Sequence, residues 1–524
     1  MVNKSNPFNF LKTQQSVTIT NTKSDEKVQD EGHDVISRYT GHFGWWNFIW
    51  AFILSMYQMS VGFQIFAFSF QTQKKDFWCA RPDDLKDTIN VTTWKLMTNQ
   101  SDYSCSMFYE GNHVKCDTFE FSDEIGHTIV QDFNLVCDRK NFLATIETCI
   151  LVGSSIAPLF SGWLSDKFGR KLILMLSATI QLIVGTAIAF TTSLPLLMVL
   201  RFIIGYASLS VGILNAILVM ELSSPKYRTI VGLINMMVAP VGNIVLALIT
   251  YFLTDWRYIQ LAISVPFVLI LLLWYWIPQS PRWLLVMNKY DELIILMERM
   301  AKMNKKTLPN DLRMILEQTP KESEGETDSN NKINPVKIAF SKKYYITTIS
   351  LIILFWTNVG MYLALSSHIV ELGGNGSFNM GIAGAIELVI TALAVIIALK
   401  LNLKLILLTA MISSAICCLL IMAVPQGHPF GVRVLGITAK CLIGAGHACI
   451  SPYAAQMVPT HIRNFVYGLA NFSAGISLII VPYIWLLEDR IHHLPTTIMG
   501  IYGILGALGV ILIRNKDKGD DKVK

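Results

Sequence analysis

The stretch Gly162-Trp-Leu-Ser-Asp-Lys-Phe-Gly-Arg-Lys171 lies between two long apolar segments. Two helices of membrane-spanning length are joined here within a few residues, and the two glycines allow their backbones to approach and turn. The side chains of Asp166, Lys167, Arg170 and Lys171 are too polar for lipid, so the turn is expected in water. Because Lys and Arg outnumber the acidic residues, the positive-inside rule predicts a cytoplasmic turn.

The composition indicates that most of the chain is solvated by lipid. Of the 524 residues, 52% are hydrophobic and 15% are charged, and the mean hydropathy is +0.45. A soluble chain of this size would need more charged surface. The net charge of +6 does not indicate a nucleic-acid partner, because the basic residues fall in predicted cytoplasmic loops. We find no nucleotide-binding loop, zinc-ligand pattern or nucleophile elbow, so neither an enzyme nor a cofactor or metal site is expected.

Twelve apolar segments are long enough to cross a bilayer, at about 44–70, 141–163, 172–190, 196–221, 230–253, 259–277, 345–365, 380–399, 405–423, 432–457, 465–487 and 496–513. We therefore predict an all-α membrane protein with two six-helix halves, at 44–277 and 344–513. Segments 1–43, 278–343 and 514–524 are predicted to be a cytoplasmic tail, linker and second tail. Residues 1–40 lack the apolar stretch of a signal peptide and are expected to be disordered.

Lysine and arginine counts support this topology. The linker alone holds a dozen, whereas the predicted outside loops after the fifth, ninth and eleventh segments hold one each, Arg257, Arg433 and Arg490. Within the linker, Tyr290–Asn304 has apolar residues at helical spacing and is predicted to be an amphipathic surface helix. Its neighbour Lys321–Lys332 has the composition of a flexible linker.

A polar insertion at 71–140 follows the first apolar segment and is predicted to be outside. It contains two glycosylation sequons, at Asn90 and Asn99, and four cysteines, Cys79, Cys105, Cys116 and Cys137. Four outside cysteines predict two disulfides, and three pairings are possible. A free or metal-bound set is the alternative, although the spacing lacks the paired C-x-x-C of zinc sites.

The two halves carry a repeated feature. Glu221 and Arg228 flank the end of the fourth segment, and Gln456 and Arg463 flank the end of the tenth. Each pair is seven residues apart, and one follows the other after six apolar segments. Such parallel repeats occur in transporters whose substrate site lies at mid-membrane between the halves.

The turn pattern G-x-L-x-D-x-x-G-R-K resembles the signature between helices 2 and 3 of the major facilitator superfamily. Four further segments resemble the organic cation, anion and zwitterion transporters of that superfamily: Phe133–Arg139, Pro225–Thr229, Asp255–Arg257 and Ser280–Leu285. Pro459-Thr460 and Arg463-Asn464 after the tenth segment agree. Sugar porters share the turn and the S-P-R-W segment but lack the Cys-rich insertion.

This resemblance implies a transporter of small organic ions that rocks its halves about a central cavity. It also implies a network of charges that holds the cytoplasmic ends together when the cavity opens outward. The expected charged members are Asp166, Arg170, Glu221, Arg228, Arg282 and Arg463, and the turn glycines Gly162 and Gly169 belong to the same gating region. The alternative is that these charges only fix the topology. Gln279 and Gln456 stand where the family usually has Glu. The first half keeps most of its network, whereas the second half has lost most of its acidic partners.

Charged residues inside membrane helices are the first candidates for the cavity. They are Glu147, Arg201, Glu387 and Lys440, for each of which an internal ion pair without a ligand role is the alternative. Further candidates are the aromatic residues Trp356 and Tyr362 and the buried amides Asn243 and Asn471. Ordinary helix packing is the alternative for the aromatic residues. Gly475 occupies the position that carries Asp in cation transporters and Arg in anion transporters.

We expect a preference for cations or zwitterions over anions. If Lys440 pairs with Glu387, Glu147 is the remaining charge, and Trp356 and Tyr362 can present their faces to a cation. An anion transporter is expected if Lys440 is free, and a receptor or scaffold on a transporter fold is the alternative of another class. The predicted surroundings are the lipid bilayer and the plasma membrane, with both termini cytoplasmic.

Overall fold

The computed structural model describes residues 34–513 except 101–102, 110–111, 123–125, 319–334, 399–401, 426–427, 459, 490 and 492. Residues 1–33, the whole of Lys321–Lys332 and the tail 514–524 lie outside the described residues. Within the described chain, eleven helices are long and apolar enough to cross a membrane. The remaining predicted span, the sixth along the chain at about 259–277, is shorter than expected. Its first helix, α13 (Trp256–Ser264), stops before Pro266, and α14 (Phe267–Leu272) follows. Proline has no N–H to continue the helical ladder, which explains the break.

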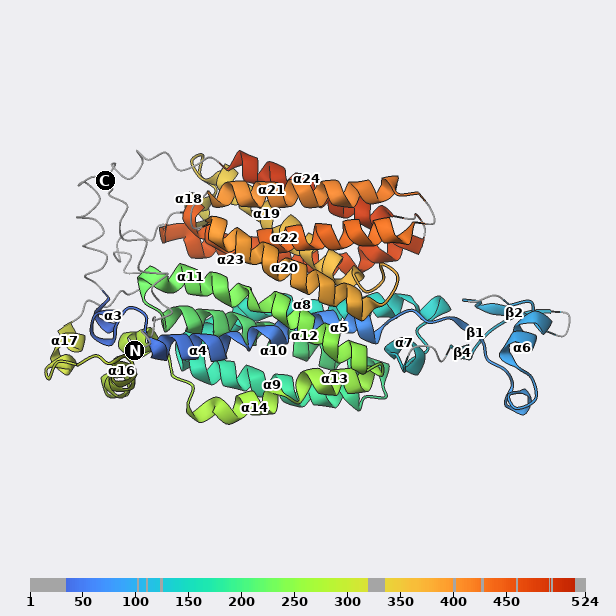
Figure 1. Ribbon diagram of the computed structural model, residues 1–524, viewed down its shortest axis with the longest axis horizontal. Coiled ribbons are helices and arrows are strands. Elements are labelled where there is room, and N and C mark those ends of the chain that lie inside the picture. Colours follow the sequence, from blue (N-terminus) through green and yellow to red (C-terminus); the bar gives the residue numbers. More distant parts are fainter. Residues whose placement is uncertain are drawn as a thin grey trace, which may run out of the picture.

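The helices form two bundles (Figure 1). The first bundle contains α4 (Trp45–Ser55), α5 (Gln58–Gln71), α8 (Asn141–Phe168), α9 (Arg170–Ala189), α10 (Leu194–Glu221), α11 (Pro225–Met236), α12 (Val238–Phe252), α13, α14 and the 3-10 helix η4 (Leu273–Tyr275). The second bundle contains α19 (Tyr345–His368), α20 (Gly376–Ala398), α21 (Leu403–Leu420), α22 (Pro429–Met457), α23 (Thr460–Trp485) and α24 (Leu494–Leu512), with η5 (Ile421–Ala423) and η6 (Leu486–Asp489). Across the boundary, α8 packs against α23, α12 against α20 and α5 against α19.

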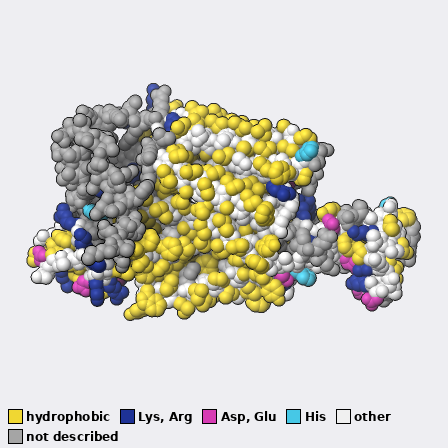
Figure 2. All heavy atoms as spheres, viewed as in Figure 1, with side chains coloured by type: hydrophobic (Ala, Val, Ile, Leu, Met, Phe, Trp, Pro, Cys, Tyr) yellow, Lys and Arg dark blue, Asp and Glu magenta, His cyan; other side chains and the backbone are white. Residues whose placement is uncertain are grey.

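The outer surface of the bundles is apolar, as lipid requires. Figure 2 shows a broad belt of hydrophobic side chains over the helices, with charged side chains gathered toward the two ends. Phe160, Trp163 and Ile183 are each more than half exposed. Large apolar side chains exposed in such numbers are stable only in contact with lipid, so the chain is a multi-pass membrane protein.

One end of the bundles carries a small disulfide-bonded extension, and we call this end the Cys-rich end. It contains β1 (Phe77–Cys79) paired antiparallel with β4 (Phe119–Phe121), and β2 (Ser106–Tyr109) paired antiparallel with β3 (Asn112–Lys115). The short helices η2 (Asp83–Leu85), α6 (Val91–Met97), α7 (Ile129–Asp132) and η3 (Cys137–Arg139) complete it. Of the three possible pairings, the structure has Cys79 with Cys116 and Cys105 with Cys137. Asn90 and Asn99 are both exposed on this extension.

The opposite end carries Gly162–Lys171, and we call it the motif end. Here α16 (Tyr290–Asn304) buries Leu293, Met297 and Met300 as its apolar spacing predicts. It is accompanied by α15 (Pro281–Val286), α17 (Leu312–Gln318) and α18 (Pro335–Ala339). The expectation of disorder throughout residues 1–40 is wrong for its last part. Val35–Thr40 forms the helix α3, because Ile36 and Thr40 are buried and Asn304 donates a hydrogen bond of 3.0 Å to the Thr40 carbonyl.

Candidate functional site

A buried ion pair lies inside the second bundle. The Lys440 ammonium on α22 pairs with Glu387 Oε2 on α20, and the two side chains are 0% and 3% exposed. Both residues lie within apolar spans. A single charge at this depth is costly, so each side chain compensates the other. This is the internal ion pair named above as the alternative to a free Lys440.

Two glycines create the space for this pair. A Cβ atom at Gly444, one turn after Lys440, would lie 2.2 Å from Glu387 Oε1. A Cβ atom at Gly384, three residues before Glu387, would lie 3.0 Å from the carbonyl oxygen of Pro240 on α12. Gly444 therefore leaves room for the carboxylate, and Gly384 allows α20 to approach the first bundle.

Two aromatic rings extend the polar region along α22 and α19. The imidazole of His447 stacks on the ring of Tyr362, with centroids 4.7 Å apart and planes at 2°. His447 Nδ1 lies 3.1 Å from Asn358 Oδ1, and Lys440 Nζ lies 5.8 Å from the centroid of Tyr362. Neither His447 nor Asn358 was predicted. The available signal was spacing, since Lys440, Gly444 and His447 recur at four and three residues and share a helix face.

The first bundle touches this region through α12 and α5. Asn243 Nδ2 lies 3.5 Å from Glu387 Oε2, and Phe66 packs edge-on against Tyr362 at 6.3 Å. We call Asn243, Asn358, Tyr362, Glu387, Lys440 and His447 the central polar cluster. It brings together amide, carboxylate, ammonium and ring groups at the boundary between the bundles, which can recognise a small polar molecule but includes no arranged nucleophile.

Two of the predicted cavity residues, Trp356 and Asn471, lie away from the central polar cluster. Trp356 is half-buried and lies six residues before Tyr362, about 240° around the helix from it. Asn471 is half-exposed rather than buried, and its amide donates to the Tyr467 carbonyl of its own helix at 2.9 Å. The prediction of a buried amide there is wrong because this local bond satisfies the donor without burial.

Gly475 is a contact between the bundles. Ser155 Oγ on α8 donates to the Gly475 carbonyl at 3.1 Å, and a Cβ atom at Gly475 would lie 2.9 Å from the Ser155 side chain. Any larger residue would separate α8 from α23 in this arrangement. The absence of a charge at position 475 is therefore explained by close packing.

The remaining charged candidates, Glu147 and Arg201, lie outside the central polar cluster. Glu147 is half-exposed on α8, close enough to Glu371 after α19 for their charges to interact. The guanidinium of Arg201 is buried on α10, where it donates to the side-chain oxygen of Gln71 and lies 5.2 Å from the Phe68 ring. The internal ion pair given as the alternative for Arg201 is therefore not formed with Glu147 or Glu387, because its neighbours are the amide of Gln71 and the ring of Phe68.

The bundles also meet at the Cys-rich end. Lys74 Nζ, after α5, lies 3.3 Å from Glu371 Oε2, and the hydroxyls of Thr250 on α12 and Ser377 on α20 are 3.0 Å apart. Partial burial raises the pKa of Glu371. The hydrogen bond and charge of His368 and the charge of Lys74 together lower the pKa by more than burial raises it, to about 2. Glu371 is thus an ionised carboxylate in this contact.

At the motif end, the predicted charges bond within the first bundle. Arg170 at the start of α9 pairs with Asp166 and, at 3.3 Å, with Glu221 at the end of α10. Gly169 has φ +103°, and a Cβ atom there would lie 2.4 Å from Gln279 Nε2. Gln279 Oε1 accepts the Lys171 backbone N–H at 2.9 Å, so the amide that replaces the family's usual Glu secures this turn.

The other members of the predicted network differ in their surroundings. Arg282 pairs with Asp34 at 3.4 Å, a partner from the segment before α3. Arg463 donates to the Val458 carbonyl at 3.4 Å, and Arg228 is half-buried in the first turn of α11. Nothing lies within 4 Å of a Cβ atom at Gly162. The expectation that Gly162 permits a close backbone approach is therefore wrong in this arrangement, and only Gly169 is required by the turn.

The fold and the boundary site define a class of membrane transporter. The profile of the Major Facilitator Superfamily matches residues 128–482, and the chain belongs to this superfamily. It is 27% identical over 506 residues to the "Organic cation transporter protein" of Drosophila melanogaster, covering 92% of each chain. It is 26% identical over 397 residues to "Solute carrier family 22 member 2" of Homo sapiens, covering 75% of this chain and 70% of the relative.

Solved structures agree on the fold. The partially occluded inward-open xylose transporter XylE from E. coli superposes with a TM-score of 0.63 at 15% identity, covering 90% of this chain and 99% of that chain. The inward-open form of the same transporter gives a TM-score of 0.62 at 17% identity. The chain is thus a multi-pass membrane transporter rather than an enzyme, and its curated relatives are named either as organic cation transporters or as members of solute carrier family 22.

Proposed function

We propose that this chain transports small organic ions, with cations or zwitterions favoured over anions. The observation that carries the charge preference is the pairing of Lys440 with Glu387. Because the ammonium is already compensated, the central polar cluster offers an incoming molecule carboxylate and amide oxygens and the face of Tyr362. An ammonium group is attracted to such a face and to such oxygens. Curated relatives named as organic cation transporters favour the same assignment.

Alternating access is the mechanism that we propose. In this arrangement, polar contacts join the bundles at the middle, through Ser155 and Gly475, and at the Cys-rich end, through Thr250–Ser377 and Lys74–Glu371. The Arg170 pairs at the motif end bond within the first bundle. This distribution supports a state that is closed at the Cys-rich end. We propose further that this end is extracellular, that the protein resides in the plasma membrane and that both termini are cytoplasmic.

Glu147 is proposed to attract the cation on its way to the central polar cluster. It lies near Glu371 toward the Cys-rich end, and two neighbouring carboxylates favour an approaching positive charge. Asp166, Arg170 and Glu221 are proposed to close the motif end when the site opens to the other side. Glycosylation of Asn90 and Asn99 remains a proposal that glycosidase digestion tests by a shift in gel mobility.

A panel of three radiolabelled probes of similar size tests the charge preference. We expect uptake of tetraethylammonium or the zwitterion betaine above that of benzoate in cells that express the chain. Glu147→Gln, which keeps the size and removes the charge, should lower tetraethylammonium uptake several-fold at an unchanged surface level. Glu292→Gln is the control, since this carboxylate is exposed on α16 and pairs with Lys289.

The panel separates the alternatives. Uptake of benzoate alone would identify an anion transporter. In such a transporter, the carboxylate of the substrate would replace Glu387 as the ion-pair partner of Lys440. Normal cation uptake by Glu147→Gln would contradict the role of that carboxylate. The absence of uptake of every probe at normal surface expression would favour the receptor or scaffold.

A further inference from the structure

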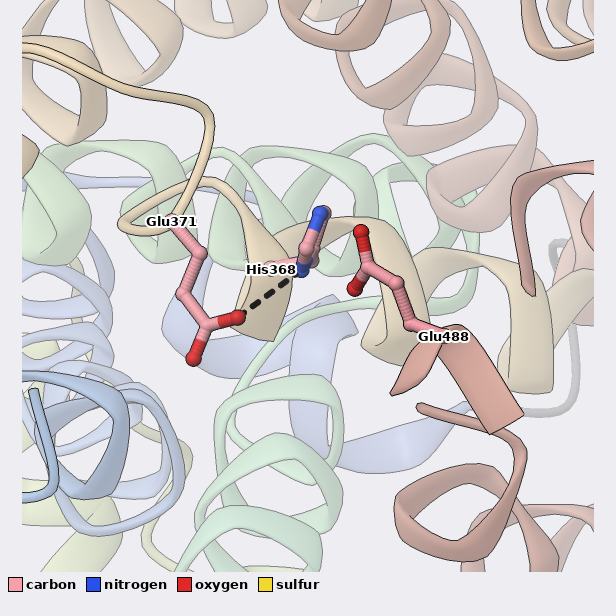
Figure 3. A group of neighbouring side chains, drawn as sticks. All are labelled: His368, Glu371 and Glu488. Atoms are coloured by element: carbon pink, nitrogen blue, oxygen red, sulfur yellow. Dashed lines mark ion pairs between the residues drawn. The ribbon is translucent and has the colours of Figure 1, made fainter. Parts of the chain in front are cut away.

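Three side chains that no sequence pattern connects meet at the Cys-rich end of the second bundle. His368 is the last residue of α19, Glu371 follows one turn later, and Glu488 lies in η6 after α23. One ligand atom from each lies within 4.8 Å of the others. In Figure 3 the two carboxylates lie on either side of the imidazole, and His368 Nδ1 is 3.5 Å from Glu371 Oε2.

We propose that His368, Glu371 and Glu488 form a binding site for a divalent transition metal, for which Zn²⁺ is the natural probe. One imidazole and two carboxylates are ligands that Zn²⁺ accepts, and three protein ligands leave the fourth tetrahedral position to water. A nitrogen ligand distinguishes the site from the all-oxygen sets that Ca²⁺ and Mg²⁺ prefer. The two carboxylate charges also balance the charge of the ion.

The surroundings hold the imidazole in place. The Trp485 ring stacks on His368 with centroids 3.7 Å apart and planes at 13°. Trp485 ends α23, and Glu488 follows three residues later, so the same segment orients the His ring and supplies a carboxylate. Supporting contacts of this kind fix the direction of a metal ligand.

The site can be reached from water. The side chains of His368 and Glu371 are 12% and 36% exposed, and Glu488 is half-exposed. His368 and Glu488 are the last residues of their candidate membrane spans, and Glu371 follows the first of these spans. An ion can therefore enter without crossing the lipid-embedded part of the protein.

Lys74 competes with the metal for one ligand. Its Nζ lies 3.3 Å from Glu371 Oε2, the same oxygen that faces His368. Lys74 belongs to the first bundle and the three ligands belong to the second. Metal binding should therefore weaken this contact between the bundles, and removal of the ammonium should favour the metal.

The test is titration of the purified full chain with Zn²⁺, monitored by isothermal titration calorimetry. We expect one saturable site, weakened at least tenfold in His368→Gln and in Glu488→Gln, and strengthened several-fold in Lys74→Gln. His127→Gln is the matched control: His127 Nδ1 lies 3.7 Å from Asp132 Oδ1, an imidazole–carboxylate pair to which, among the residues that the structure describes, no second acid adds a ligand. Its affinity should not change.

Thermal unfolding with and without Zn²⁺ supplies a second measurement that does not depend on heats of binding. Zn²⁺ should raise the unfolding midpoint of the wild type and of His127→Gln, and should leave that of Glu488→Gln unchanged. The proposal is overturned if the wild type has no saturable site, or if His368→Gln and Glu488→Gln bind Zn²⁺ as the wild type does. It is independent of the transported substrate, because none of the readouts measures uptake.

Discussion

At the scale of single residues, the pair Glu387–Lys440 makes a sharp prediction about stability. Both side chains are buried, so removing one partner leaves an uncompensated charge, which costs about 3–5 kcal/mol. We expect Glu387→Gln and Lys440→Met each to lower the unfolding midpoint and the amount of protein at the surface. The double variant should recover part of both losses, because it has no unpaired charge.

Fluorescence-detected size-exclusion chromatography after a heat ramp measures this double-mutant cycle. Losses that simply add in the double variant would show that the two side chains do not compensate each other. Gly468→Ala is a suitable control, since nothing lies within 4 Å of a Cβ atom there.

The sequence predicted these two charges as candidates and left open whether they pair with each other. Each stands out because an ionisable residue in an apolar segment is rare. Their partner choice depends on the packing of α20 against α22 across 53 residues of chain, which no local pattern encodes. His447 was missed because its spacing from Lys440 places the two on one helix face but does not show that Asn358 and Tyr362 of α19 lie beside it.

At the scale of elements, the turn between α8 and α9 and the end of α10 act together through Arg170. Asp166 is 66% exposed, whereas Glu221 is 19% exposed. Less solvent screening makes the Glu221 pair the stronger of the two. We therefore expect Glu221→Gln to reduce uptake more than Asp166→Asn, and Asp166→Asn more than Gln456→Ala, whose side chain is exposed on α22.

Initial uptake rates at matched surface expression give this ranking. Equal losses in the three variants would contradict it. A larger loss in Gln456→Ala would instead place the stronger contact in the second bundle.

Helix positions were largely predictable because hydropathy is a local property of the sequence. The exceptions have physical reasons in particular residues. Pro266 interrupts the expected sixth helix, and the packing of Ile36 orders α3 in a segment that its polar composition predicts as disordered. Asp34 could not be foreseen as the partner of Arg282, since nearly 250 residues separate them.

At the scale of the whole molecule, the proposed transport requires the two bundles to rock about the central polar cluster. Thr250 and Ser377 offer a way to stop that motion, because their hydroxyls are 3.0 Å apart across the boundary between the bundles. Cysteines at both positions should form a disulfide on oxidation. Such a bond would hold the Cys-rich end closed, so the site could open only toward the motif end.

The most direct test is exchange of radiolabelled tetraethylammonium into proteoliposomes that contain purified Thr250→Cys/Ser377→Cys protein and unlabelled tetraethylammonium. We predict exchange in the reduced protein, loss of exchange on oxidation and recovery with dithiothreitol, while wild type and both single variants are unaffected by the oxidant. Undiminished exchange in the protein with the disulfide formed would contradict alternating access. Absence of exchange in the wild type, with betaine as well, would contradict transport of organic cations and zwitterions.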